Sequence, residues 1–110
     1  MALSSTAIGT TNTTVYTSSG NNAIACMVVC NVYEFNPSFP TDHTAKLSIW
    51  AVANGSSASN TNLIVNALPI TAGETLSLDQ EKLVLGNGDT LVAKSDTGST
   101  LSITISTLPV

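Results

Sequence analysis

Basic residues are scarce in this sequence. The 110-residue chain has no arginine, and its lysines are Lys46, Lys82 and Lys94. Proteins that bind nucleic acid need a basic surface that neutralises phosphates, and anionic membrane surfaces attract the same kind of surface. The sequence therefore predicts a protein that binds neither nucleic acid nor a membrane.

Charged residues of either sign are few. They make up 9% of the chain, with a formal net charge of −4, whereas typical globular domains carry about 25% charged residues. Serine, threonine and asparagine supply most of the polar side chains instead. Two interpretations stay open: a neutral β-sheet surface, or a surface that is buried against further copies or a larger assembly, because weak charge repulsion favours association.

Long apolar runs are missing as well. No stretch is long enough to cross a bilayer as a helix. Residues 1–12 are polar and uncharged, without the basic start and apolar middle of a secretory signal. We therefore expect synthesis in a cytoplasm.

Cysteine is limited to Cys26 and Cys30. In a β-strand this spacing puts both side chains on one face, about 13 Å apart, which is too far for a disulfide. Only His43 could join them as a metal ligand, and three such residues at this spacing do not make a zinc site. We expect two small buried side chains and no bound metal.

Catalytic arrangements are also lacking. His43 is the only histidine, and its neighbour Asp42 is poorly placed to orient the ring because adjacent side chains diverge. No Gly-x-Ser-x-Gly elbow, phosphate-binding glycine loop or facing pair of carboxylates is apparent. Asp89 follows a glycine in a turn, where a bond to its own backbone is more plausible than calcium binding. The sequence predicts a protein that is not an enzyme and has no cofactor.

Helix signals are nearly absent, and short strand signals recur between glycine, asparagine and proline. They predict one all-β domain over residues 13–110, an antiparallel β-sandwich of jelly-roll or immunoglobulin-like topology with about seven to eight strands. Residues 1–12 are predicted to be an extended arm. The expected strands are 13–17, 23–32, 45–53, 62–68 (stopped by Pro69), 74–78, 82–85, 91–95 and a last strand in which Leu101, Ile103, Ile105 and Leu108 share a face.

Five residues are candidates for an interface. Tyr33, Phe35 and Phe39 gather in or beside the long proline-containing segment 33–44. They either close one end of the core or form a contact site, since aromatic residues are favoured anchors in interfaces. Leu3 and Ile8 are the apolar anchors of the arm, which is either disordered or able to pair with a neighbour's sheet edge. Trp50, in a predicted strand, is expected in the core.

From Gly73 the chain reads GETLSLDQEKLVLGNGDTLVAKS and it closes with LSITISTL, while Val15-Tyr16-Thr17 precedes an apolar strand that ends in Cys30-Asn31-Val32. This order of segments resembles that of small virion structural proteins of tailed bacteriophages. The resemblance covers residues 14–110, and the stretch 83–93 is its most characteristic part. The segment with Pro37 and Phe39 has no counterpart in the pattern, so the specificity of a partner there stays open.

The resemblance implies a β-sandwich on the outside of a phage particle. Its first expectation is a capsid decoration or cement protein, made in the host cytoplasm and located on the virion, that binds the major capsid protein or other virion proteins. By analogy with the local threefold sites of capsid lattices it implies a homotrimer. Alternatives are a neck, tail or baseplate protein, a carbohydrate- or receptor-binding module, and a pilus or surface-layer subunit.

Overall fold

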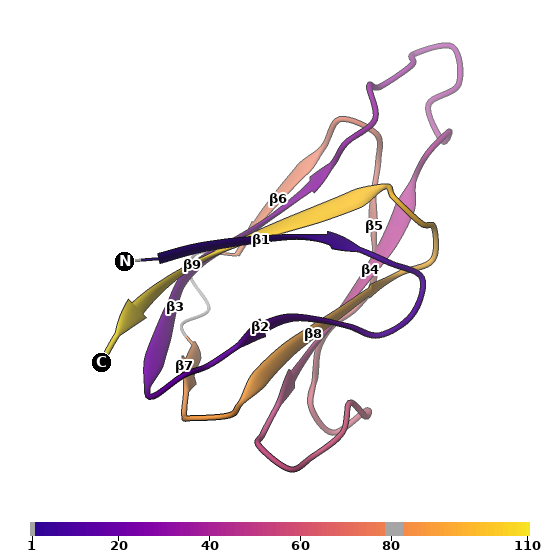
Figure 1. Cartoon of the computed structure of the whole chain (residues 1–110). Coiled ribbons are helices and arrows are strands. Elements are labelled where there is room, and N and C mark those ends of the chain that lie inside the picture. Colours follow the sequence, from indigo (N-terminus) through magenta and orange to yellow (C-terminus); the bar gives the residue numbers. More distant parts are fainter. Residues whose placement is uncertain (1, 79–82) are drawn as a thin grey trace.

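The chain folds into two antiparallel sheets that pack face to face as a β-sandwich (Figure 1). The computed structural model describes residues 2–78 and 83–110, and all of the regular structure in these ranges is β. The prediction of an all-β sandwich is confirmed. The five-stranded sheet has the order β1-β9-β3-β6, with β7 also beside β3: β1 (Ala2–Ile8), β9 (Leu101–Pro109), β3 (Asn22–Asn31), β6 (Thr75–Leu78) and β7 (Leu83–Leu85).

The second sheet has four strands in the order β2-β8-β4-β5. Their bounds are β2 (Thr13–Thr17), β8 (Thr90–Ser95), β4 (Ala45–Val52) and β5 (Leu63–Ile70). The described residues thus form nine strands, one more than the upper expectation from the sequence. The additional strand is β1, in the segment 1–12 that was expected as an arm. The expected start of a strand at Lys82 lies outside the described residues.

The core lies between the two sheets and is made by alternate residues of each strand. Ile103 and Ile105 on β9 and Leu47 and Ile49 on β4 belong to this core, and all four are fully buried. The expectation that Leu108 continues this face is wrong, because Leu108 is half-exposed and Thr107 is buried in its place. The odd-numbered residues of β9 face inward from Leu101 to Thr107, so a polar side chain closes the core at that end.

A β-bulge sets which residues of β3 face the core. The pairing with β9 shifts between Ile24 and Cys26, so Ala25 is the additional residue. Ile24 and Met27 are three positions apart, and both are buried. A regular strand would place them on opposite faces. The bulge therefore explains why this stretch looks apolar on both faces in the sequence.

Proline does not end β5. The strand continues through Pro69, which is paired with Lys46, and ends at Ile70. Since β5 is the last strand of its sheet, a residue without an N–H donor is tolerated there. The expectation that Pro69 stops the strand is wrong for this reason.

Trp50 lies on the outer face of the four-stranded sheet rather than in the core. It is partly buried, and it lines a shallow depression together with Lys46, Ser48 and Lys94. Its neighbour Ile49 points the other way and is fully buried. The expectation of a core tryptophan is wrong because the alternation along β4 gives the inward positions to Leu47 and Ile49.

No helix in the described ranges is long and apolar enough to cross a membrane.

Two substitutions at adjacent positions of β4 test this arrangement. Replacement of the fully buried Ile49 by alanine is expected to lower the free energy of unfolding by about 2–5 kcal/mol, because it leaves a cavity between the sheets. Trp50→Ala is expected to cost less than about 2 kcal/mol, although it removes a larger side chain, because Trp50 lies on the outer face and its loss leaves no cavity between the sheets. Urea unfolding followed by circular dichroism measures both. An equal or larger loss for Trp50→Ala would contradict the placement of Trp50.

Candidate functional site

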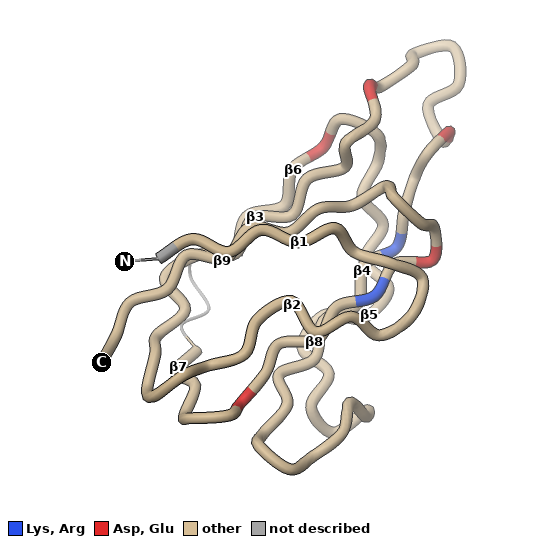
Figure 2. Tube along the Cα trace, viewed as in Figure 1, with Lys and Arg blue, Asp and Glu red and all other residues tan. Residues whose placement is uncertain are grey.

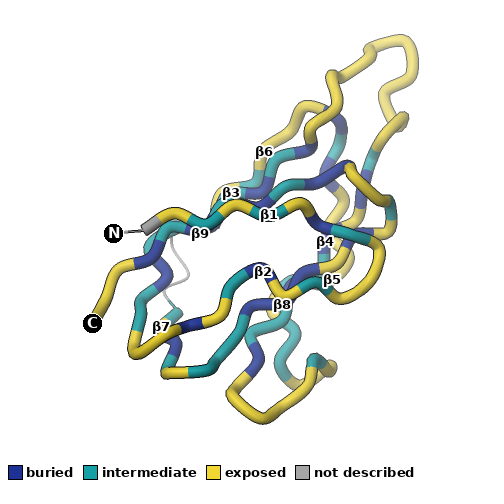
Figure 3. The backbone as a smooth tube through the Cα atoms, viewed as in Figure 1, coloured by how far each residue is buried: buried dark blue, intermediate teal, exposed yellow. Residues whose placement is uncertain are grey.

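The segment 32–44 protrudes from one end of the sandwich and connects β3 to β4 (Figure 1). Nearly all of it is exposed (Figure 3). The exposed fractions of Tyr33, Phe35 and Phe39 are 38%, 52% and 65%. The interpretation that these three rings close the end of the core is therefore wrong. They lie on a projecting loop, which we call the aromatic loop (residues 32–44), and they are accessible to a partner.

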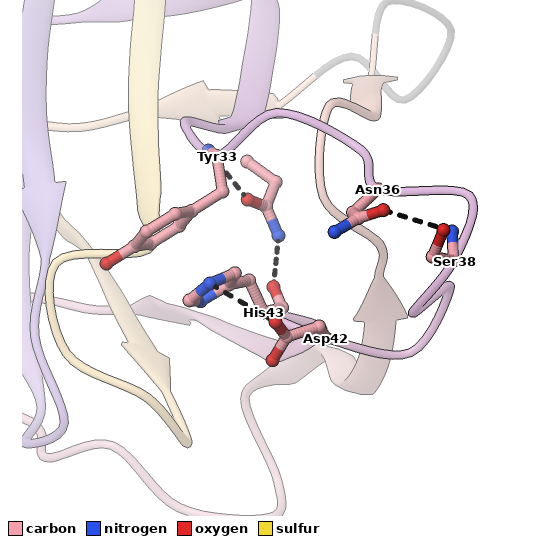
Figure 4. A network of polar contacts seen from close by, with 6 residues as sticks. Tyr33, Asn36, Ser38, Asp42 and His43 are labelled. Carbon is pink, nitrogen blue, oxygen red and sulfur yellow. Dashed lines mark hydrogen bonds and ion pairs between the residues drawn. The ribbon is translucent and has the colours of Figure 1, made fainter.

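The base of the aromatic loop is held by the side chain of Asn31. This residue is the last of β3 and is 1% exposed. Its Nδ2 donates hydrogen bonds to the carbonyl of His43 (2.8 Å) and to that of Ile70 (3.0 Å), and its Oδ1 accepts one from the N–H of Tyr33 (3.1 Å). Figure 4 shows the contacts with Tyr33 and His43. One amide thus ties the start of the loop, its end and the neighbouring strand β5 together.

Backbone hydrogen bonds fix the same region from the outside. The N–H of Asn31 donates to the carbonyl of Glu74, and the N–H of Val32 donates to that of Thr100. The turn between β5 and β6 packs against the loop at Gly73, whose φ of +78° favours glycine and whose α-carbon faces the backbone of Phe35. The first residues of the loop therefore have a defined path.

The tip of the loop is a series of turns. The N–H of Phe39 donates to the carbonyl of Asn36, and the N–H of Asp42 donates to that of Phe39, each at 3.0 Å. The side chain of Asn36 accepts a hydrogen bond from the N–H of Ser38 (Figure 4), as in an Asx turn. These local bonds order the backbone that carries Phe39.

Two rings stack where the loop closes. The centroids of Tyr33 and His43 are 3.8 Å apart, and the ring planes differ by 1°. His43 has a positive φ of 59°, and its Nε2 lies 3.6 Å from the Asp42 carboxylate, closer than the sequence led us to expect. The left-handed backbone at His43 departs from an extended strand, in which adjacent side chains point to opposite sides. Both side chains are about half-exposed, so this pair resembles a surface contact rather than a buried catalytic dyad.

A hollow of about 390 Å³ lies beside the stacked rings. Its lining combines aromatic and polar side chains, among them Tyr33, Phe35, Asn36, Asp42 and His43. This composition provides apolar area with hydrogen-bonding groups around it. The arrangement is suited to binding, because it offers apolar contact and orientation at the same place.

The other two interface candidates lie on β1, apart from the aromatic loop. Leu3 is 74% exposed, whereas Ile8 is 1% exposed and belongs to the core. Ile8 is therefore not accessible to a partner in this structure. Leu3 borders a groove of about 540 Å³ between β1 and β2, which Tyr16 and Thr107 also line.

The cysteines and Asp89 have structural surroundings. Cys26 and Cys30 are free, as expected from their spacing, but they are only partly buried because they alternate with the inward residues of β3. Asp89 accepts hydrogen bonds from the N–H groups of Gly86 (2.8 Å) and Asn54 (2.9 Å). The interpretation of Asp89 as a turn residue is confirmed. The described residues contain no group of three or more potential ligands that could hold a metal ion.

Sequence reasoning missed the role of Asn31. The available signal was that Asn31 is a polar residue at the end of an apolar strand, where the alternation of the strand predicts that its side chain points to the core. The sequence contains nothing that identifies its partners, because the carbonyls of His43 and Ile70 lie 12 and 39 residues further along the chain.

Comparisons of the chain with protein-family models, with curated proteins and with solved structures find no match.

The anchoring role of Asn31 can be tested by thermal and urea unfolding. Asn31→Ala is expected to lower the free energy of unfolding by about 2–4 kcal/mol, because two carbonyls and one N–H lose their partner at a buried position. Asn36→Ala, which removes one exposed turn contact, serves as the control and is expected to cost less than about 1 kcal/mol. Similar stabilities of the two variants would show that the amide does not hold the loop.

Proposed function

We propose that this chain is a non-enzymatic structural protein that binds an assembled partner through the aromatic loop. The observation that carries the proposal is the exposure of Phe35 and Phe39 on a loop whose base and tip are both hydrogen-bonded. Large aromatic side chains give much contact area, and a preordered loop loses little conformational entropy on binding.

The more specific form of the proposal is a capsid decoration or cement protein of a tailed bacteriophage, located on the virion. It is supported by the resemblance of residues 14–110 to small virion structural proteins and by the low charge of the chain. A protein that binds only the intact shell stabilises that shell by mass action. The partner is then the major capsid protein or, for a neck, tail or baseplate location, another virion protein.

A second candidate is a carbohydrate-binding module. The hollow beside Tyr33 and His43 favours it, because an aromatic surface with neighbouring amide and carboxylate groups is suited to a sugar ring. This candidate uses the same loop but a different ligand, so a binding experiment separates the two.

The test compares binding to particles with binding to glycans. Virus particles from the source of the sequence are purified on a density gradient, and mass spectrometry determines whether the chain is among their proteins. Purified chain is then sedimented with particles that lack it. We expect the wild-type chain to sediment with the particles, and we expect the Phe35→Ala, Phe39→Ala double variant to lose at least about tenfold in affinity, as for removal of interface anchors.

The matched control replaces two exposed apolar side chains elsewhere, in an Ile64→Ala, Val84→Ala double variant. Ile64 is 43% exposed and Val84 is 66% exposed, and both lie outside the aromatic loop. This variant is expected to bind like the wild type. Absence of the chain from particles together with binding on a glycan array would replace the virion proposal by the carbohydrate module. Full particle binding by the Phe35, Phe39 variant would show that the loop is not the contact.

A further inference from the structure

Strand β1 is an unprotected sheet edge, and it differs from the other edges in this respect. Natural β proteins block their edge strands with prolines, charges, bulges or short length. β5 contains Pro69 and a residue with positive φ, Ala67, and its pairing with β4 is irregular. The pairing of β2 shifts between Thr14 and Tyr16, and β6 and β7 have four and three residues. Each of these four edges carries at least one such device.

β1 carries none of these devices. It has seven residues with the sequence ALSSTAI, without proline or charge. Its pairing with β9 continues without a register shift from Ala2 to Ile8, and among the described residues β9 is its one strand partner. An antiparallel strand that is paired on one side directs every second N–H and C=O to the other side. β1 therefore presents a straight row of donors and acceptors at the rim of the sandwich.

The sequence of β1 is complementary to itself. Leu3, Ser5 and Ala7 are exposed and share the outer face, while Ser4 and Thr6 share the inner one. If two copies of β1 are laid antiparallel about a twofold axis at Ser5, Leu3 faces the Ala7 of the second copy and the two Ser5 hydroxyls face each other. Ser5 already makes this kind of contact within the chain, at 3.1 Å from the hydroxyl of Thr104. Such cross-strand apolar and hydroxyl pairs stabilise sheets.

Charge does not oppose this pairing. Figure 2 shows no charged residue on β1 or on its neighbour β9, although the chain carries a net charge of −4. The pairing would also cover Leu3, which has the largest exposed fraction among the large apolar side chains of the described residues. A second copy of this chain would thus pair the free backbone groups of β1, cover the exposed Leu3 and place the two Ser5 hydroxyls opposite each other.

We propose that two copies of this protein associate through antiparallel pairing of their β1 strands about a twofold axis at Ser5, which joins their five-stranded sheets into one. Isologous twofold contacts of this kind close on themselves and therefore give dimers and not fibres. The proposal goes beyond the proposed function, because it uses the β1 edge and leaves the aromatic loop free. It also predicts a dimer, whereas the capsid analogy implies a homotrimer.

The first measurement is the mass of the wild-type chain in solution by sedimentation equilibrium. Seven residues of edge form a smaller interface than the 1,200–2,000 Å² typical of stable complexes, so the dimer is expected to depend on concentration. The mass is expected to rise from the 11.3 kDa of one chain toward twice that value as the concentration increases to about 1 mM, the range of weak specific association. A mass that stays at one chain throughout this range, or a trimer, would overturn the proposal.

Charge variants at the proposed axis locate the interface. Ser5→Lys places two like charges opposite each other in the dimer, and Ser5→Glu does the same with the opposite sign. Each variant alone is expected to dimerise at least about tenfold more weakly than the wild type. An equimolar mixture of the two is expected to recover the association as a heterodimer, because the facing charges then attract. This recovery also shows that the variants are folded.

The control variant is Thr75→Lys, which adds the same charge to the outer face of the same sheet at its opposite edge. Thr75 is exposed and lies on β6. It is expected to dimerise like the wild type. A dimer that persists in Ser5→Lys, or a mixture that stays monomeric, would show that the copies do not meet at β1.

Discussion

The hydrogen bonds of the buried Asn31 amide determine where the aromatic loop stands. A buried amide that loses its partners costs more than an ordinary hydrogen bond contributes, so the surrounding backbone is constrained to satisfy it. Its two donors and its acceptor are used by backbone groups on both ends of the loop and on β5. The buried Asn31 thus fixes the position of the exposed aromatic loop. The rings on this loop are ordered by a residue that is itself not accessible to a partner.

Much of the fold could be predicted from the sequence, because alternation and turn residues are local signals. The strands around Leu47 and Ile49 and the turn at Asp89 follow from short stretches of chain. The face of β4 to which the Trp50 side chain points could not be predicted in this way, since both faces of β4 carry apolar residues. The bulge at Ala25 could not be predicted for a similar reason. A bulge is defined by the pairing with the partner strand, and a run of apolar residues has no alternation that would reveal it.

The candidate site was predictable in composition but not in arrangement. The sequence shows that Tyr33, Phe35 and Phe39 lie close together in the chain, but it leaves open whether their rings lie in the core or at the surface. The rings are exposed because the loop projects from the end of the sandwich. Contacts with distant segments at Asn31 and Gly73 hold the loop in this position. The same limit applies to Leu3 and Ile8, which lie on one strand and yet point to solvent and to the core, respectively.

The bulge on β3 has a consequence for how this chain can change in length. Residues before Ala25 pair with β7 and residues after it pair with β6, so the bulge lies where one neighbour gives way to the next. Loss of this one residue would leave Ile24 and Met27 two positions apart, so a regular strand would still direct both side chains into the interior. A deletion between Met27 and Val29 would instead move one of these two buried side chains to the outer face. The bulge therefore marks the place where β3 can become one residue shorter while its core face is kept.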